Sequence, residues 1–216
     1  MYKRQTEQRD ALTAARRKQI LEAALQLFSE RGFEATSMET LATVAGVAKG
    51  TLYLYFPTKD ALRDTIFAEY GLLDDVTARV ATLGDAPPQT VIRVIVEEIW
   101  RLLREREQVI RLMMAELQRS PERAREFNER VVHRADRLLA AYFEAEAKRG
   151  RMRPTDGIVA ARALVGTVLS LFLSQEIWGG REITPLADEQ ITQTITDIFL
   201  NGLLVAAPAP TRGRVK

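Results

Sequence analysis

Residues 36–62 read TSMETLATVAGVAKGTLYLYFPTKDAL, and this stretch predicts two short helices joined by a tight glycine turn. Ser37 is a good N-cap for the first helix, because its hydroxyl can accept a hydrogen bond from a free backbone N–H of the first turn. Leu41, Ala42 and Ala45 recur at helical spacing and mark the inward face. Gly46 then supplies the positive φ that ends this helix.

The second helix of the stretch is expected over about residues 48–55. Leu52 and Phe56 lie four residues apart on its inner face, whereas Lys, Thr and Tyr side chains fall on or near the outer face. Gly50 costs about 1 kcal/mol relative to alanine inside a helix, but it lets the helix approach a DNA backbone closely. The pattern predicts a helix-turn-helix, which delivers its second helix to the major groove.

The same stretch resembles the DNA-binding domain of the TetR family of bacterial transcriptional regulators. The resemblance covers about residues 13–65, and its most specific run is AGVAKGTLYLYFPTKDAL at 45–62. Upstream, the runs ILEAA (20–24), LFSERGF (27–33) and ATS (35–37) also match. The rest of the chain resembles the family only in length and helical character.

Two positions depart from the family pattern. The family often has serine where this chain has Ala48, and alanine cannot cap the helix that follows. Leu54 stands where a polar residue is common, which puts a polar contact with DNA in doubt there. The alternative is an apolar contact with a thymine methyl group.

The match to the family motif implies which residues contact DNA. Phosphate contacts set affinity and base contacts set specificity. The implied backbone contacts are Ser37, Thr51, Tyr53, Tyr55 and Lys59, with Gly50 at the close approach; Lys49 and Thr51 are the candidates for base contacts, and Arg16 and Arg17 for phosphate or minor-groove contacts. Alternatives stay open, since Tyr53 could belong to the core, Lys59 could be an ordinary surface lysine, and the N-terminal basic residues could simply be solvated.

The composition argues against an enzyme. The 216 residues include no cysteine and one histidine, which excludes disulfides, thiolate metal sites and Cys–His catalysis. His133, on a charged helix, is interpreted as a surface or interface residue. No phosphate-binding glycine loop and no serine elbow is present, so neither a cofactor nor a metal is expected.

Charge is distributed unevenly along the chain, although the net charge is only +2. Residues 1–20 hold six basic and two acidic side chains, and residues 207–216 hold three basic ones. Basic ends on a mildly acidic body suit a DNA-binding protein, while the alternative is that they only aid solubility. The first 19 residues are too polar for a signal peptide, so a cytoplasmic location is expected.

The chain is expected to be all-α, with a three-helix helix-turn-helix domain followed by a larger helical bundle. We predict a flexible basic arm at 1–12, the DNA-binding domain at 13–60, an effector-binding and dimerisation domain at 61–206, and a flexible basic tail at 207–216. Helical patterns cover 13–31, 59–81 with a bend near 71–75, 89–106, 108–119, 121–149, 156–178 and 187–206.

Residues 157–177 form one membrane-like stretch, but Arg162, Gln175 and Glu176 favour a buried helix over a membrane span. The family resemblance implies that the last two large helices form a four-helix dimer interface. The interface candidates are Ala163, Gly166, Thr167, Ser170, Ile191, Ile195, Ile198 and Phe199. The alternative is that both helices pack only inside one subunit.

The resemblance also implies that the bundle binds a small-molecule effector that releases DNA. Large apolar side chains are the candidate pocket residues, with ordinary core packing as the alternative: Phe67, Tyr70, Ile95, Trp100, Met113, Met114, Phe127 and Tyr142. The expected function is a homodimeric repressor on a palindromic operator. The rival class is a helical interaction or membrane-associated protein that happens to contain a helix-turn-helix.

Overall fold

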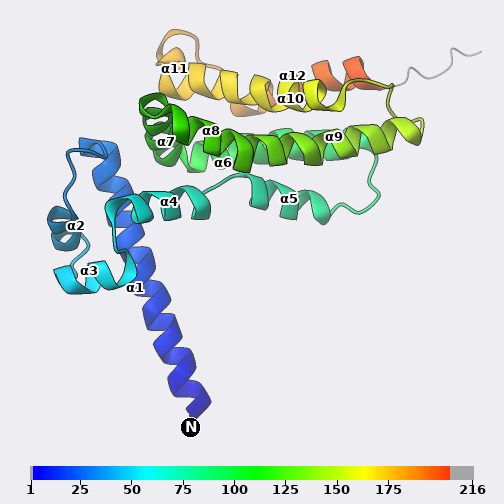
Figure 1. The fold of residues 1–216 in the computed structure, drawn as a ribbon. Helices are drawn as coiled ribbons and strands as arrows, with labels where there is room; N and C mark the ends of the chain where they lie inside the picture. Colours follow the sequence, from blue (N-terminus) through cyan, green and yellow to red (C-terminus); the bar gives the residue numbers. More distant parts are fainter. Residues whose placement is uncertain (1, 205–216) are drawn as a thin grey trace, which may run out of the picture. The chain divides into compact units, whose positions relative to one another are not determined.

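The structure, a computed structural model, describes residues 2–204 and is all-α over that part of the chain, as predicted (Figure 1). Within those residues the single β-type contact is an isolated bridge between Met152 and Leu204. The basic tail predicted at 207–216 lies outside the described residues. The chain divides into two compact units, which are described separately: unit 1 holds residues up to Gly71 together with Glu105–Ala124, and unit 2 holds Leu72–Arg104 and the residues from Arg125 onward.

Unit 1 contains the predicted helix-turn-helix. Its helices are α1 (Tyr2–Arg31), α2 (Met38–Val44), α3 (Lys49–Tyr55), α4 (Lys59–Glu69) and α7 (Glu107–Arg119). Apolar side chains from all five helices share one core, which includes Phe28, Leu41, Leu52, Leu62 and Leu112. Gly32 has a φ of 84° and Gly46 a φ of 61°, so each provides the left-handed residue that ends a helix.

The N-terminus differs from the prediction. Residues 2–12, expected to be a flexible arm, continue α1 as one helix to Arg31. The physical reason is propensity, because residues 2–31 contain neither glycine nor proline and are rich in Ala, Leu, Arg, Gln and Glu. Polarity alone does not indicate flexibility, because polar residues with high helix propensity also form helices.

The domain boundary also differs from the predicted division at residue 60. The whole of α4 belongs to unit 1, and so does α7, which lies much later in the chain. Val109 and Leu112 of α7 are buried in the unit 1 core. Because helix spacing reports only which face of α7 is apolar, the sequence did not indicate which unit covers that face.

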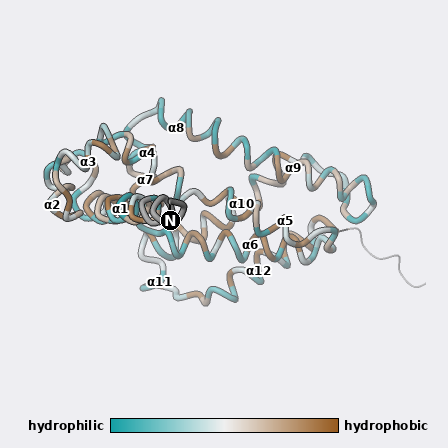
Figure 2. The backbone as a smooth tube through the Cα atoms, turned by 90° about the horizontal axis from the view of Figure 1, so that it is seen from below, coloured by the Kyte–Doolittle hydropathy of each residue, from teal (hydrophilic) through white to brown (hydrophobic). Residues whose placement is uncertain are grey.

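Unit 2 is built from α5 (Leu73–Ala81), α6 (Pro88–Glu105), α9 (His133–Lys148), α10 (Gly157–Phe172), α11 (Gly180–Ile183) and α12 (Asp188–Leu203). The short α8 (Pro121–Phe127) precedes a π-helical segment, η1 (Asn128–Val132), and a second one, η2 (Leu173–Ile177), extends α10. The tube along α9 alternates between hydrophilic and hydrophobic colours, as expected for an amphipathic helix (Figure 2).

The central helix of unit 2 is α10, which packs against α9 and α12. Gly157 permits the close approach to α9, since a Cβ atom there would lie 3.0 Å from Cα and Cβ of Ala140. The buried carboxylate of Asp136 accepts a hydrogen bond from Arg162 at 2.7 Å. On α6, Trp100 packs edge-on against Phe172 of α10, with ring centroids 6.2 Å apart.

Residues 157–177 were expected to be buried, and the structure corrects this in part. Among the described helices this is the one long and apolar enough to cross a membrane by length and composition, and 39% of its apolar window is buried. One face belongs to the core, whereas Val159, Ala163, Gly166 and Ser170 are exposed along the other. Helical spacing predicts that the small residues share one face of the helix. It does not predict that no other part of the subunit covers that face.

Candidate nucleic-acid interface

The turn between α2 and α3 forms as the sequence predicts. Ser37 is the N-cap of α2, and its hydroxyl oxygen accepts a hydrogen bond from the Thr40 backbone N–H at 3.0 Å. Gln19 of α1 donates to the carbonyl of Ala45 at 2.7 Å, which ties the turn to the first helix. Ala48 is the N-cap of α3 and makes no side-chain capping bond, as expected for alanine.

The α3 helix presents one buried face and one open face. Leu52 is fully buried and Phe56 is 3% exposed, which anchors the helix to the unit 1 core. On the other side, Tyr53 is 42% exposed and Leu54 is 83% exposed. Tyr53 is thus open to contact on this side, although more than half of its surface is covered.

The remaining candidates on α3 differ in availability. Lys49 and Gly50 are exposed, Thr51 is half-buried, and the half-buried Tyr55 packs against the apolar core. The Lys49 ammonium lies 3.8 Å from the carboxylate of Glu39, and both side chains are more than half exposed. Such an exposed pair contributes little, so Lys49 is free to exchange it for DNA.

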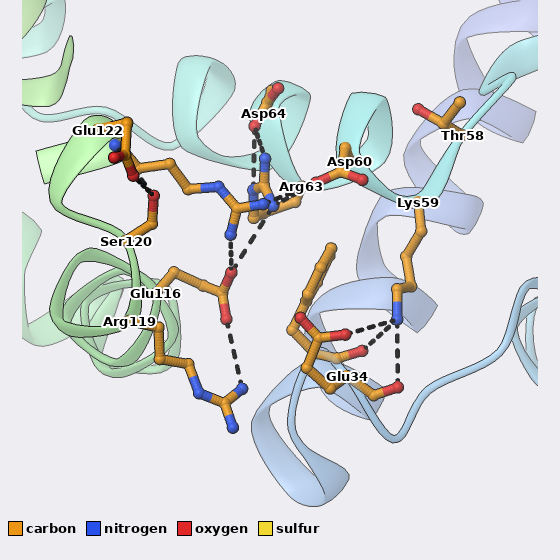
Figure 3. Close-up of polar contacts among 12 residues, drawn as sticks. Glu34, Thr58, Lys59, Asp60, Arg63, Asp64, Glu116, Arg119, Ser120 and Glu122 are labelled. Carbon is orange, nitrogen blue, oxygen red and sulfur yellow. Dashed lines mark hydrogen bonds and ion pairs between the residues drawn. The ribbon is translucent and has the colours of Figure 1, made fainter.

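The side chain of Lys59, at the start of α4, is bonded within unit 1. Its ammonium donates to the carbonyl oxygens of Phe33 at 2.7 Å and Glu34 at 3.2 Å, and lies 4.4 Å from the Phe33 ring centroid (Figure 3). These contacts hold the chain after α1 against the start of α4. In the structure Lys59 holds this segment in place, so it is not an ordinary surface lysine, and a phosphate contact would require its ammonium to leave these carbonyl oxygens.

The two candidate arginines of α1 also differ from each other. Arg16 is exposed and donates to the nearby Gln19 at 3.1 Å. Arg17 pairs with Glu69 of α4, and its guanidinium lies 5.6 Å from the Phe56 ring centroid. Arg16 remains a candidate for DNA contact, whereas Arg17 holds α1 against α4 in the structure.

A network of ion pairs, centred on the buried Arg63 and Glu116, joins α4 to α7 (Figure 3). Arg63, 4% exposed, donates to Asp60 and Asp64, each at 2.6 Å, and lies 3.6 Å from Glu116 of α7. Glu116 is 2% exposed and accepts a hydrogen bond from Arg123 at 2.7 Å. Burial lowers the pKa of the Arg63 guanidinium, but the bonds and charges of Asp64 and Asp60 outweigh it and raise that pKa.

Sequence reasoning missed this network. Asp60 stands three residues before Arg63, a helical spacing that indicates local pairing, and Asp64 is the next residue in the chain. Glu116 lies 53 positions from Arg63 along the chain. The sequence around it predicts an ordinary charged residue on the solvated face of a helix. No signal in a single sequence identifies such a distant partner.

The eight candidate effector residues divide between the two units. Phe67, Tyr70, Met113 and Met114 belong to unit 1, and Ile95, Trp100, Phe127 and Tyr142 belong to unit 2. Phe67 and Tyr70 pack against the unit 1 core, and Ile95 and Trp100 are buried in unit 2. The alternative of core packing therefore describes these four, and the effector site stays a prediction.

Tyr142 of unit 2 combines a large ring with a buried polar group. Its hydroxyl is buried and has no hydrogen-bond partner among the described residues. Burial first, and then the negative charge of Glu146, raise the pKa of Tyr142 to about 12. An unsatisfied buried hydroxyl is costly unless something else occupies its hydrogen bond.

The dimer candidates also divide. Ala163, Gly166 and Ser170 of α10 and Ile198 of α12 are exposed, and Thr167 and Phe199 are half-buried. Residues 162, 163, 166, 167, 170 and 171 line a shallow depression on α10. Ile191 is 3% exposed and Ile195 is 1% exposed, so both pack inside the subunit and are removed from the predicted interface. Ile191 and Ile195 belong to the inward stripe of α12, whereas Ile198 lies on its outward side.

Comparison with known proteins agrees with this geometry. Residues 20–66 match the family model described as bacterial regulatory proteins of the tetR family, and residues 90–202 match that of the AefR-like transcriptional repressor C-terminal domain. An uncharacterised HTH-type transcriptional regulator, YhgD of Bacillus subtilis, is 26% identical over 87% of this chain and 96% of its own length.

Two further similarities differ in the share of the chain that they cover. The HTH-type transcriptional repressor KstR of Mycolicibacterium smegmatis is 44% identical over 75 residues, which is 34% of this chain and 37% of KstR. The solved structure of the fatty acid degradation regulator FadR from Bacillus halodurans has a TM-score of 0.70 at 21% identity and covers 87% of this chain and 95% of that one. Family models over both parts, with relatives that span nearly the whole length, establish that this chain belongs to the TetR family of bacterial transcriptional regulators.

Proposed function

We propose that this regulator is a homodimeric repressor that binds a palindromic operator and is released by a small-molecule effector. The observation that carries the DNA part is the open face of α3, which presents Lys49, Gly50, Thr51 and Tyr53 on the second helix of the helix-turn-helix. Ser37 at the start of α2 and Arg16 on α1 complete the contact set. Repression is favoured by the names of the AefR-like domain model and of KstR.

Gly50 offers a sharp test of DNA binding. A Cβ atom at this position meets nothing within 4 Å, and glycine inside a helix costs about 1 kcal/mol relative to alanine. Gly50→Ala should therefore raise the melting temperature. If α3 enters the major groove closely at Gly50, the same variant should bind operator DNA more weakly in an electrophoretic shift. Raised stability with unchanged DNA affinity would place the protein–DNA contact elsewhere.

Dimerisation is supported by the exposed small-residue face of α10. Gly166, like Gly50, has open space where a Cβ atom would stand, so Gly166→Gln should not disturb the subunit itself. If two copies pack closely through this face, the longer side chain should convert the protein to monomers in sedimentation or light scattering. A variant that stays dimeric would show that the interface lies on another surface.

A dimer predicts the form of the operator. Two recognition helices in successive major grooves on one face of the duplex are about 34 Å apart, or a multiple of that distance. The footprint should therefore have two-fold symmetry with half-sites one or more helical turns apart. Lys49→Ala should reduce discrimination between operator and random duplex, because base contacts carry specificity. A footprint without symmetry argues against a dimer on DNA.

The effector proposal rests on the helical unit that follows the DNA-binding domain. A ligand that prefers the released conformation by about 1–3 kcal/mol changes DNA affinity by about 5- to 150-fold. FadR, which shares the fold, is named for fatty acid degradation, so a fatty acid series is a reasonable first set of compounds. A thermal-shift screen followed by operator release tests the proposal. Binding without release would remove the regulatory role while leaving the ligand site.

A further inference from the structure

Leu54 is the most exposed of the large apolar side chains that the structure describes in unit 1, at 83% of its surface. The unit buries its other leucines on α2 to α4, with Leu41, Leu52 and Leu62 all fully buried. An isobutyl group left in water on the helix that enters DNA needs a partner that is apolar. Core packing does not provide one, because Leu52 and Phe56 already occupy the inner face of α3.

The helical geometry places Leu54 at the centre of the open face. With about 100° between successive residues, Leu54 points almost opposite to the direction shared by Leu52 and Phe56. Gly50 is one turn earlier on the same face, and side chains on a helix lean over the preceding turn. Gly50 therefore leaves the Leu54 side chain uncovered, and Ala48 adds no polar group at the start of the helix.

Polar side chains flank the apolar strip that Gly50 and Leu54 form on the open face of α3. Thr51 lies on one side and Tyr53 on the other, with Lys49 at the N-terminal end of α3. Phosphates and most base edges match such hydrogen-bonding groups, but the side chains of the strip itself can neither donate nor accept a hydrogen bond. In the major groove, the apolar feature that distinguishes base pairs is the C5-methyl group of thymine.

We propose that Leu54 is a specificity-determining residue that reads a thymine methyl group in each operator half-site, with Gly50 providing the clearance. The proposal rests on DNA binding through α3, as proposed above. Burying one methyl group is worth about a fourfold change in affinity, or about 16-fold for a dimer that reads two half-sites.

The test replaces thymine by deoxyuridine, which removes only the methyl group. A duplex selected by the wild-type protein from a random-sequence library is substituted symmetrically, one thymine position at a time, and affinities are measured at fixed salt. The wild type should lose about 16-fold at one half-site position. Leu54→Ala should lose a similar factor on the thymine duplex and become indifferent to deoxyuridine at that position, while Leu54→Met should keep the sensitivity.

Ile183 provides the matched control, since it is equally exposed at 83% but lies on α11 in unit 2. Ile183→Ala should keep both the wild-type affinity and the wild-type response to deoxyuridine. The inference is overturned if no thymine position matters, or if Leu54→Ala keeps the deoxyuridine response. Failure of the wild-type protein to select any duplex would instead overturn the proposed DNA binding itself, so the two failures are distinguishable.

Discussion

The ion network between α4 and α7 gives the prediction that tests the structure of unit 1 most directly. Glu116→Gln keeps the shape of the side chain and removes its charge. The Glu116 carboxylate is 2% exposed and accepts a charge-assisted hydrogen bond from Arg123 at 2.7 Å, with Arg63 at 3.6 Å. Removing one member of a buried ion pair typically costs about 3–5 kcal/mol, because the partner charge stays buried.

Three features of this network reduce that cost. Arg63 retains Asp60 and Asp64, although both are more than half exposed and therefore compensate only in part. Arg123 is about one third exposed and also retains Asp60 at 3.0 Å. Glutamine still offers one acceptor oxygen. We therefore expect Glu116→Gln to lower the free energy of unfolding by about 2 kcal/mol, near the middle of the range for hydrogen bonds to charged groups.

Urea unfolding followed by circular dichroism measures this change. Both tryptophans, Trp100 and Trp178, belong to unit 2, so fluorescence does not report on the network directly. Hydrogen exchange of α4 and α7 peptides supplies the local readout, and both helices should lose protection. Glu126→Gln is the control, since Glu126 pairs with Arg130 at 3.0 Å with both side chains more than half exposed, and should cost less than about 0.5 kcal/mol. Equal effects in the two variants would refute the reasoning.

Three other changes test individual contacts. Lys59→Met should cost about 1–2 kcal/mol in urea unfolding by removing the bonds to Phe33 and Glu34, yet leave the salt dependence of DNA binding unchanged; a slope lower by about one unit would restore Lys59 as a phosphate contact. Tyr142→Phe should be neutral or stabilising at pH 7 because it removes a hydroxyl without a partner. Since the folded pKa of Tyr142 is about 12, above its ordinary 10, the wild type gains stability below pH 10 that it loses towards pH 12, and the phenylalanine variant should lack this decline in pH-dependent unfolding. Gly157→Ala should lower the melting temperature, in contrast to Gly50→Ala, because its Cβ atom would crowd Ala140 at 3.0 Å; an unchanged or raised value would mean that α9 and α10 separate easily.

The features predicted correctly from the sequence depend on neighbours a few residues apart. The cap at Ser37, the turn at Gly46 and the uncapped start of α3 each follow from one residue type at a local position. The buried face of α3 follows from the spacing of Leu52 and Phe56. Such features are fixed by backbone geometry and side-chain chemistry within one or two turns, so a single sequence contains the necessary information.

The errors concern contacts between segments far apart in the chain. Lys59 resembles a free cation until Phe33, 26 residues earlier, is placed beside it. Ile191 and Ile195 form an apolar stripe, but periodicity cannot distinguish a stripe that faces its own subunit from one that faces a second copy. In each case the sequence shows whether the residue is charged or apolar. It does not show which distant residue the side chain contacts.

The position of α7 explains why the most consequential of these missing partners is Glu116. Helix α7 belongs to unit 1, yet the chain before Glu105 and after Ala124 belongs to unit 2, so both ends of α7 continue into the other unit. Two ion pairs attach this segment to the N-terminal part of α4. Glu116 pairs with Arg63, and Arg123 pairs with Asp60. Moving Glu116 away from its guanidinium partners would leave a carboxylate unpaired in the protein interior, so these contacts fix α7 against α4 within unit 1.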